Sequence, residues 1–89
     1  MKAIVTVIGK DQVGIIANVC GLLAKNSVNI LDISQTILSE HFTMIMLVDV
    51  SASQVSFTEL SEALTESGKK MALSIHIQRE DIFETMHRI

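Results

Sequence analysis

The sequence predicts an α+β fold of the ferredoxin-like type, a βαββαβ sandwich with a four-stranded antiparallel sheet and an additional C-terminal helix. Two observations support this prediction. Segments with strand-like alternation and segments with a helical period follow one another along the chain in this order. The chain has 89 residues and no proline, and no linker interrupts it, so it has room for one domain with one core. We expect residues 1–79 to form this domain and residues 80–89 to form the helix.

The first strand and the first helix are separated by a change of period at Gly14. Residues 3–8 are a mainly β-branched run that Gly9 stops, which is typical of a buried strand. From Gly14 the apolar residues recur every three or four positions, which predicts a helix that ends near residues 25–27. The members of its apolar face are expected to be Ile15, Ile16, Val19, Cys20 and Leu23.

The middle of the chain is predicted to form a β-hairpin. Residues 28–38 alternate, residues 39–41 form a short polar turn, and residues 42–50 form the partner strand. In the first of these strands Leu31, Ile33 and Ile37 are expected on one face and Asp32, Ser34 and Thr36 on the other. The partner strand is apolar on both faces, with Met44, Met46 and Val48 on one and Ile45 and Leu47 on the other. Because a solvated sheet face should be polar, we expect the C-terminal helix or another subunit to cover the second face.

The second half of the chain repeats the change of period. Residues 56–59 match a capping box, in which Ser56 accepts from the backbone three residues on, and a second helix follows. We expect Gly68 to end this helix in a left-handed conformation. Residues 71–79 alternate as the last strand, and Glu80 opens the C-terminal helix. The apolar stripes of the two helices are Phe57, Leu60, Ala63 and Leu64, and then Ile82, Phe83, Met86 and Ile89.

Composition excludes several classes of protein. The formal net charge of −3 argues against general affinity for nucleic acid or an anionic membrane surface. No apolar run approaches the ~20 residues that span a bilayer, and the first residues lack the layout of a signal peptide. We therefore expect a cytoplasmic protein. Cys20 is the single cysteine and the three histidines show no ligand spacing, so we expect no disulfide, no metal and no cofactor.

No catalytic constellation is present, so the sequence predicts a binding protein and not an enzyme. There is no P-loop, no G-x-S-x-G and no H-E-x-x-H pattern. Cys20 lies on the apolar stripe of the first helix, where packing is the expected role. His76 alternates with apolar residues of the last strand, so we expect it on the sheet surface or at an interface.

The turn between the first strand and the first helix is the candidate site. Gly9 permits a tight exit from the strand, and Gly14 permits close approach to the backbone at the start of the helix. The first turn of that helix presents free amides that suit an anion, and Asp11 adds a carboxylate. Amides for a carboxylate and an acid for an ammonium group would suit a free amino acid. The alternative is that Asp11 caps the helix and the glycines serve only the turn.

This turn and the start of the next strand resemble the ACT domain. The resemblance extends over about the first seventy-nine residues in element order and is carried by Gly9, Asp11, Gly14, Ile15, Asn29 and Ile30. The helix at residues 80–89 resembles that of small stand-alone bacterial ACT proteins related to glycine-cleavage regulators. This helix is expected to pack on its own domain or on the partner.

The resemblance implies a regulatory module that binds a small effector, often an amino acid, in a homodimer or higher homo-oligomer. The pairing is side by side or face to face, with the ligand between the first turn of one subunit and the second strand of its neighbour. Carried onto this chain, the ligand-binding residues are Asp11, Gln12, Val13, Gly14, Ile15 and Asn29. Asn29 has an alternative role as a turn residue. Two functions stay open: an amino-acid sensor that acts on a regulated protein partner, and a structural protein–protein interaction module with no ligand.

Overall fold

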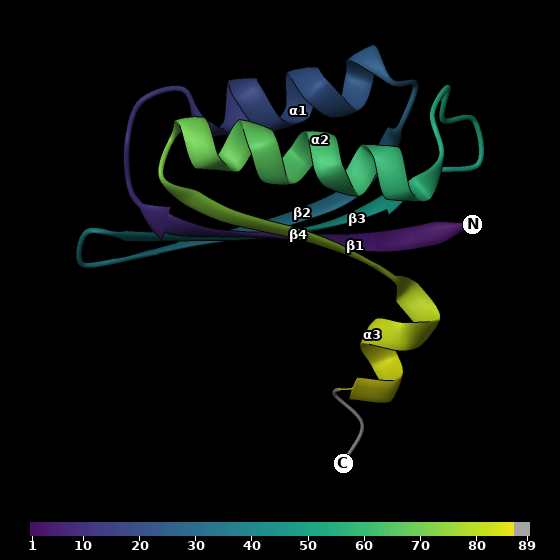
Figure 1. Ribbon diagram of the computed structural model, residues 1–89. Helices are drawn as coiled ribbons and strands as arrows, with labels where there is room; N and C mark the ends of the chain where they lie inside the picture. Colours follow the sequence, from purple (N-terminus) through teal and green to yellow (C-terminus); the bar gives the residue numbers. More distant parts are fainter. Residues whose placement is uncertain (87–89) are drawn as a thin grey trace.

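The computed structural model describes the backbone of residues 1–86 and the side chains of residues 1–83, and it confirms the predicted fold (Figure 1). The elements are β1 (Lys2–Lys10), α1 (Ile15–Lys25), β2 (Asn29–Leu38), β3 (His41–Asp49), α2 (Phe57–Lys70), β4 (Leu73–Arg79) and α3 (Glu80–Met86). The strands form one antiparallel sheet in the order β2-β3-β1-β4. Figure 1 shows α1 and α2 on one face of the sheet and α3 on the other side. The predictions for Met86 and Ile89 concern side chains outside the described part.

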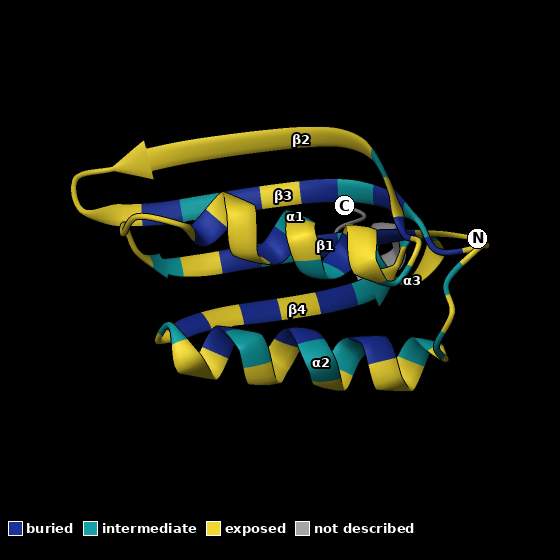
Figure 2. Cartoon of the chain, turned by 90° about the horizontal axis from the view of Figure 1, so that it is seen from above, coloured by how far each residue is buried: buried dark blue, intermediate teal, exposed yellow. Residues whose placement is uncertain are grey.

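The hydrophobic core lies between the sheet and the helices α1 and α2. Alternate residues of β1, β3 and β4 face these helices, and Figure 2 shows the alternation as buried and exposed bands. Burial of each aliphatic side chain stabilises the fold by about 1.5–3 kcal/mol. The buried members are Ala3, Val5, Val7, Ile15, Val19, Leu23, Val28, Phe42, Met44, Met46, Val48, Val50, Leu60, Leu64, Leu73, Ile75 and Ile77.

The apolar face of α1 is narrower than predicted. Ile15, Val19 and Leu23 follow one another at four-residue spacing and are buried, whereas Ile16 is 41% exposed. Cys20 is half-buried and packs against the edge of the core. Ile16 lies one position further around the helix than Ile15, on the flank that the sheet does not cover. Its assignment to the buried face was wrong.

The second face of the sheet is apolar and only partly covered, as the two-sided pattern of β3 predicts. Met44 and Met46 face the helices and are fully buried, whereas Ile45 on the opposite face is 41% exposed. On β1, Ile8 points to the same open face and is 47% exposed. The helix α3 contacts β1 and β4 on this side, so it covers one end of the face and leaves the centre to solvent.

The strand β2 contains an irregularity that the alternation does not predict. The register with β3 shifts between Ile30 and Asp32, so Leu31 is an extra residue and the predicted unbroken alternation is wrong at that point. From Asp32 onward the side chains of β2 lie on the predicted faces. Ile33 pairs with Met46, whose buried side chain faces the helices, so Ile33 is on the helix side of the sheet. Ile33 is nevertheless 42% exposed, because β2 is an edge strand that the helices α1 and α2 leave largely uncovered (Figure 2).

Two glycines have roles other than those predicted, and both roles involve Leu73. Gly9 does not stop the strand, because β1 continues to Lys10. A Cβ atom at Gly9 would lie 2.5 Å from Leu73 Cδ2. Gly68 does not end its helix either, since α2 runs to Lys70, and a Cβ atom there would lie 2.8 Å from the Leu73 carbonyl oxygen. Both glycines therefore serve close packing, and the residue with positive φ in this region is Ala72, at 56°.

A pair of glycine substitutions separates close packing from helix propensity. Gly68→Ala should lower the free energy of unfolding by about 1–3 kcal/mol, because the new methyl group meets a backbone oxygen. Gly21→Ala in α1 is the matched control, since a Cβ atom there has no neighbour within 4 Å. This control should raise the free energy of unfolding by about 0.5–1 kcal/mol. Urea unfolding measures both, and a stabilising Gly68→Ala would contradict the packing role.

Candidate functional site

The turn between β1 and α1 is held from two sides by parts of the chain far away in sequence. The backbone amide of Asp11 donates to the carbonyl of Glu40 in the β2–β3 hairpin, at 2.8 Å. The side-chain amide of Gln12 donates to the carbonyl of Met71 after α2, at 2.7 Å. In α1, Asn18 Nδ2 contacts the sulfur of the same Met71. The turn is therefore anchored to both neighbouring loops.

The first turn of α1 presents backbone amides without a side-chain cap. Gly14 is the N-cap residue, with φ of 92°, and no side chain accepts from the amides that follow it. The first amide of the helix ladder is that of Asn18, which donates to the Gly14 carbonyl. The interpretation that Asp11 caps this helix is therefore wrong. A Cβ atom at Gly14 would meet nothing within 4 Å, so the glycine is required for its positive φ, and the space around it is open.

The predicted site residues of the turn divide into exposed and buried ones. Asp11 and Gln12 are exposed, and Val13 is 100% exposed. The side chain of Ile15 is 2% exposed and belongs to the core, so only its backbone can face a ligand. The side chain of Gln12 is already engaged with Met71. The groups available for binding are thus the carboxylate of Asp11, the free amides from Gly14 onward and the apolar surface of Val13.

Asn29 lies at the opposite end of the sheet from the turn. It pairs with Asp49 of β3, and Asp49 in turn pairs with Lys2 at the start of β1. The turn follows Lys10 at the other end of β1, so roughly 26 Å of extended strand separates the two sites. Within one chain, the structure does not bring Asn29 to the turn. A site that uses both needs two chains.

The sequence interpretation missed two residues that shape these positions. Met71 holds Gln12 and Asn18, and no local pattern could reveal contacts across more than fifty residues. Asp49 lies directly opposite Asn29, and hydrogen bonds from the hydroxyl and the amide of Ser51 lower the pKa of its carboxyl group. The spacing of Asp49 and Ser51 is that of an Asx turn, which was a signal available in the sequence.

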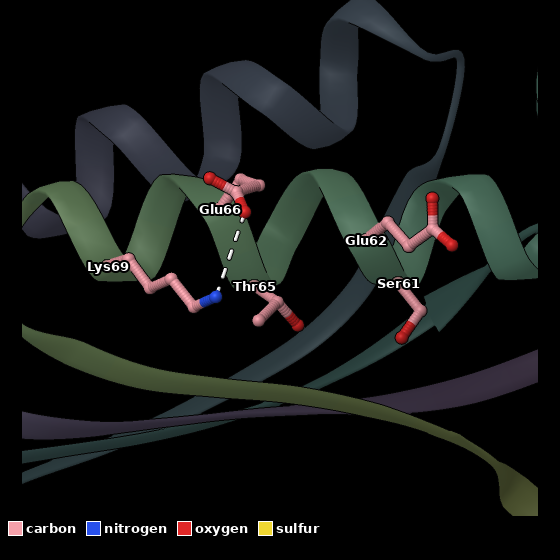
Figure 3. A pocket seen from close by; sticks show the side chains of 5 residues that line it. All are labelled: Ser61, Glu62, Thr65, Glu66 and Lys69. Carbon is pink, nitrogen blue, oxygen red and sulfur yellow. Dashed lines mark ion pairs between the residues drawn. The ribbon is translucent and has the colours of Figure 1, made fainter.

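A shallow hollow lies along α2, away from the turn. Its volume is about 330 Å³, and Figure 3 shows its lining side chains. Glu66 and Lys69 form an ion pair there at 3.7 Å. The lining residues all belong to one helix: Ser61, Glu62, Thr65, Glu66 and Lys69. The hollow therefore has one wall and is not an enclosed ligand pocket.

Within the described residues, no three His, Cys, Asp or Glu side chains gather in a way that could hold a metal ion. None of the helices in this part of the chain is long and apolar enough to cross a bilayer. Cys20 is half-buried, and burial raises the pKa of its thiol, which disfavours the thiolate form. His76 is exposed on the open face of the sheet, where its Nε2 lies 3.0 Å from the Ser74 hydroxyl.

The chain is similar to known proteins over most of its length. A family model described as the ACT domain matches residues 2–78. A UPF0237 protein of Clostridium acetobutylicum is 61% identical over 89 residues, which are 100% of both chains. The solved structure of an ACT domain protein from Streptococcus pneumoniae is 46% identical, with a TM-score of 0.82 and 94% of each chain covered. A putative glycine cleavage system transcriptional repressor shares the fold, at 23% identity and a TM-score of 0.75, over 86% of this chain and 44% of that one.

Because no side chain caps the first turn of α1, the contribution of Asp11 to the free energy of unfolding should be small, and this can be tested. Asp11→Ala should change the free energy of unfolding by less than about 0.5 kcal/mol, because its side chain caps nothing. Ser56→Ala is the positive control, since the Ser56 hydroxyl accepts from the Glu59 amide at 3.1 Å. Loss of that cap should cost about 1 kcal/mol. Thermal unfolding of both variants measures the difference, and equal losses would mean that Asp11 is a cap after all.

Proposed function

Because this chain belongs to the ACT domain family, we propose that it is a cytoplasmic regulatory module and not an enzyme. Proteins of this family typically bind small molecules, often amino acids, and regulate other proteins. The proposed ligand is a free amino acid, held at the turn of residues 11–14. The proposed working form is a homo-oligomer. Binding of the ligand to it is transmitted to a regulated protein partner.

The uncapped first turn of α1 beside Asp11 is the observation that carries this proposal. The amides that follow Gly14 have no side-chain acceptor, and a Cβ atom placed on Gly14 would meet nothing within 4 Å. Such amides, together with the positive end of the helix dipole, suit a carboxylate. The exposed carboxylate of Asp11 suits the ammonium group of the same ligand. Val13, fully exposed, is available to contact an apolar side chain of the ligand or of a neighbouring chain.

Two copies of the chain complete the site in this proposal. Asn29 supplies an amide with both a donor and an acceptor, and it lies at the far end of the sheet in its own chain. A neighbouring chain related by a two-fold axis would bring its own Asn29 end to the turn of the first. The partly exposed apolar face with Ile8 and Ile45, and the edge strand β2 with Ile33 and Ile37, both supply area for such an assembly.

The second candidate function is a structural interaction module that binds no small molecule. The full exposure of Val13 favours it, because an apolar side chain at a loop tip is also what a protein interface uses. The two functions differ in one observable property. A sensor changes its stability or its assembly when an amino acid is added, and a purely structural module does not.

Amino-acid binding is tested by isothermal titration of the full chain against the proteinogenic amino acids at millimolar concentration. We expect heat with at least one of them. Asp11→Ala and Asn29→Ala should each abolish that heat and leave the melting temperature nearly unchanged, because both side chains are exposed. Ala52→Ser, in an exposed loop, is a control that should bind like the parent chain. Absence of heat with every amino acid would reject this ligand class.

Assembly is tested by sedimentation of two charge-introducing variants with and without the amino-acid mixture. Ile45→Glu places a charge on the open face, and Ile37→Glu places one on the edge strand β2. We expect one of them to sediment as a monomer, because an unpaired charge in an apolar interface costs several kcal/mol. The variant that dissociates identifies the face-to-face or the side-by-side arrangement. A parent chain that sediments as a monomer under all conditions would reject the two-chain site.

A further inference from the structure

The sheet has two edges, and the helices cover them unequally. The strands β2 and β4 are the first and last of the sheet, so the outer side of each pairs with no further strand of the described part of the chain. In Figure 2, α2 lies on the outer side of β4, whereas β2 extends beyond α1 and is exposed along almost its whole length. A strand that approaches β2 therefore meets no helix, and one that approaches β4 meets α2.

The outer edge of β2 is regular after the bulge at Leu31. Residues 32–38 keep one register with β3, and they contain neither lysine nor proline, which commonly protect edge strands. The amide of Ile33 donates to the exposed Asp32 carboxylate at 2.9 Å, so this amide points away from β3. Because the backbone groups of a strand alternate between its two sides, those of residues 35 and 37 point outward as well. These outward groups can form hydrogen bonds with an added strand.

The side chains of this stretch follow a pattern that is the same in both directions. From Ile33 to Ile37 they are aliphatic, hydroxyl, amide, hydroxyl and aliphatic. In a second copy that pairs antiparallel about Gln35, Ile37 lies opposite Ile33 of the first copy. Thr36 then lies opposite Ser34 on the other face of the sheet. A shift by two residues would place Gln35 opposite an isoleucine, so the side chains favour this one register.

This register also covers the apolar surface that α1 leaves open. The side chains of Ile33 and Ile37 lie on the helix side of the sheet and are 42% and 51% exposed. In the paired form each packs against the isoleucine opposite, which removes both from water in both copies. The two-fold axis is perpendicular to the sheet, so the helices of both copies lie on one side. They do not collide, because α1 lies on the inner side of β2 in each copy (Figure 2).

The open face of the sheet is less suited to a second copy. Its residues Ile8 and Ile45 are partly exposed, but α3 stands out from this face in Figure 1 and contacts β1 and β4. Two sheets that pack face to face are about 10 Å apart, and a helix with its side chains is about 10–12 Å wide. The helix α3 of each copy would therefore hold two such sheets apart.

The geometry points to a homodimer in which the outer edge of β2 pairs antiparallel with β2 of a second copy, with Gln35 of both chains at the two-fold axis. This inference rests on the homo-oligomer of the proposed function and specifies its interface. On pairing, the amide of Ile33 exchanges the Asp32 carboxylate for the carbonyl of Ile37 in the second copy. The two sheets join into one continuous antiparallel sheet.

This pairing brings Asn29 of the second copy to the end of the sheet that carries the turn. In each chain Leu38 leads into the hairpin, where the carbonyl of Glu40 holds the amide of Asp11. Pairing about Gln35 places residue 32 of the second copy opposite Leu38, and Asn29 follows beyond it, past the end of the hairpin. The turn and Asn29, which one chain holds at opposite ends, therefore lie at the same end of the dimer.

Disulfide cross-linking tests the register. In a Cys20→Ala background, Gln35→Cys should give a disulfide-linked dimer on oxidation with diamide, because directly paired Cα atoms are about 5.5 Å apart. Thr36→Cys is the matched control and should stay a monomer on a non-reducing gel, since an offset of two residues separates its Cα atoms by about 7–8 Å. Chains with Ser34→Cys and with Thr36→Cys should cross-link when mixed. A dimer of Thr36→Cys in place of Gln35→Cys would overturn the register.

Exchange of charges tests the same interface without cysteine. Ile33→Lys and Ile37→Glu should each sediment as a monomer, because each places a charge against an isoleucine of the other copy. Mixed in equal amounts they should form a heterodimer, in which the introduced charges lie opposite each other. Ile45→Glu on the open face should leave the dimer intact. A mixture that stays monomeric, or dissociation by Ile45→Glu alone, would overturn the pairing through β2.

Amino-acid titration of the cross-linked Gln35→Cys dimer separates this inference from the proposed ligand. Cross-linking at Gln35 without heat from any amino acid would support the β2 interface and reject the ligand class. Heat in the parent chain without cross-linking at Gln35 would support the ligand and overturn the interface.

Discussion

The position of Leu73 between two glycines is the constraint on which the rest of the structure depends. Gly9 of β1 and Gly68 of α2 both lack a side chain where Leu73 approaches, and an added methyl group at either would overlap with it. This contact sets how closely the end of α2 and the start of β4 pack against the central strand. It also brings Met71 beside the β1–α1 turn, where its carbonyl accepts from Gln12. The core packing and the candidate site therefore share one set of contacts.

The same packing explains why the site has only one half in each chain. An antiparallel sheet places the end of β1 and the start of β2 at opposite ends, because β2 and β1 both pair with β3. The turn is therefore rigidly placed at one end, and Asn29 is placed with Asp49 at the other. A ligand that contacts both would join two chains. Binding and assembly would then be linked, as expected for a regulatory module.

The errors of the sequence interpretation have one cause, which is that local patterns do not report long-range contacts. Glycine is common at helix ends, but Gly68 lies within α2, where the absence of a side chain leaves room for the carbonyl oxygen of Leu73. The bulge at Leu31 depends on pairing with β3, so an alternation read along one strand could not reveal it. The hydrogen bond from the Glu59 amide to the Ser56 hydroxyl at the start of α2 was predicted correctly, because both residues lie within one turn of the helix.

The sequence by itself determined the order of elements, the faces of the strands and the position of the turn, because these depend on periodicity and on residues near one another. It also pointed to Asn29 as a residue of another subunit, through resemblance and not through spacing. Only the tertiary structure decided that Asp11 leaves the helix uncapped, that the side chain of Gln12 is engaged with Met71, and that α2 overhangs the outer edge of β4. Each of these depends on segments that the fold brings together from distant parts of the chain.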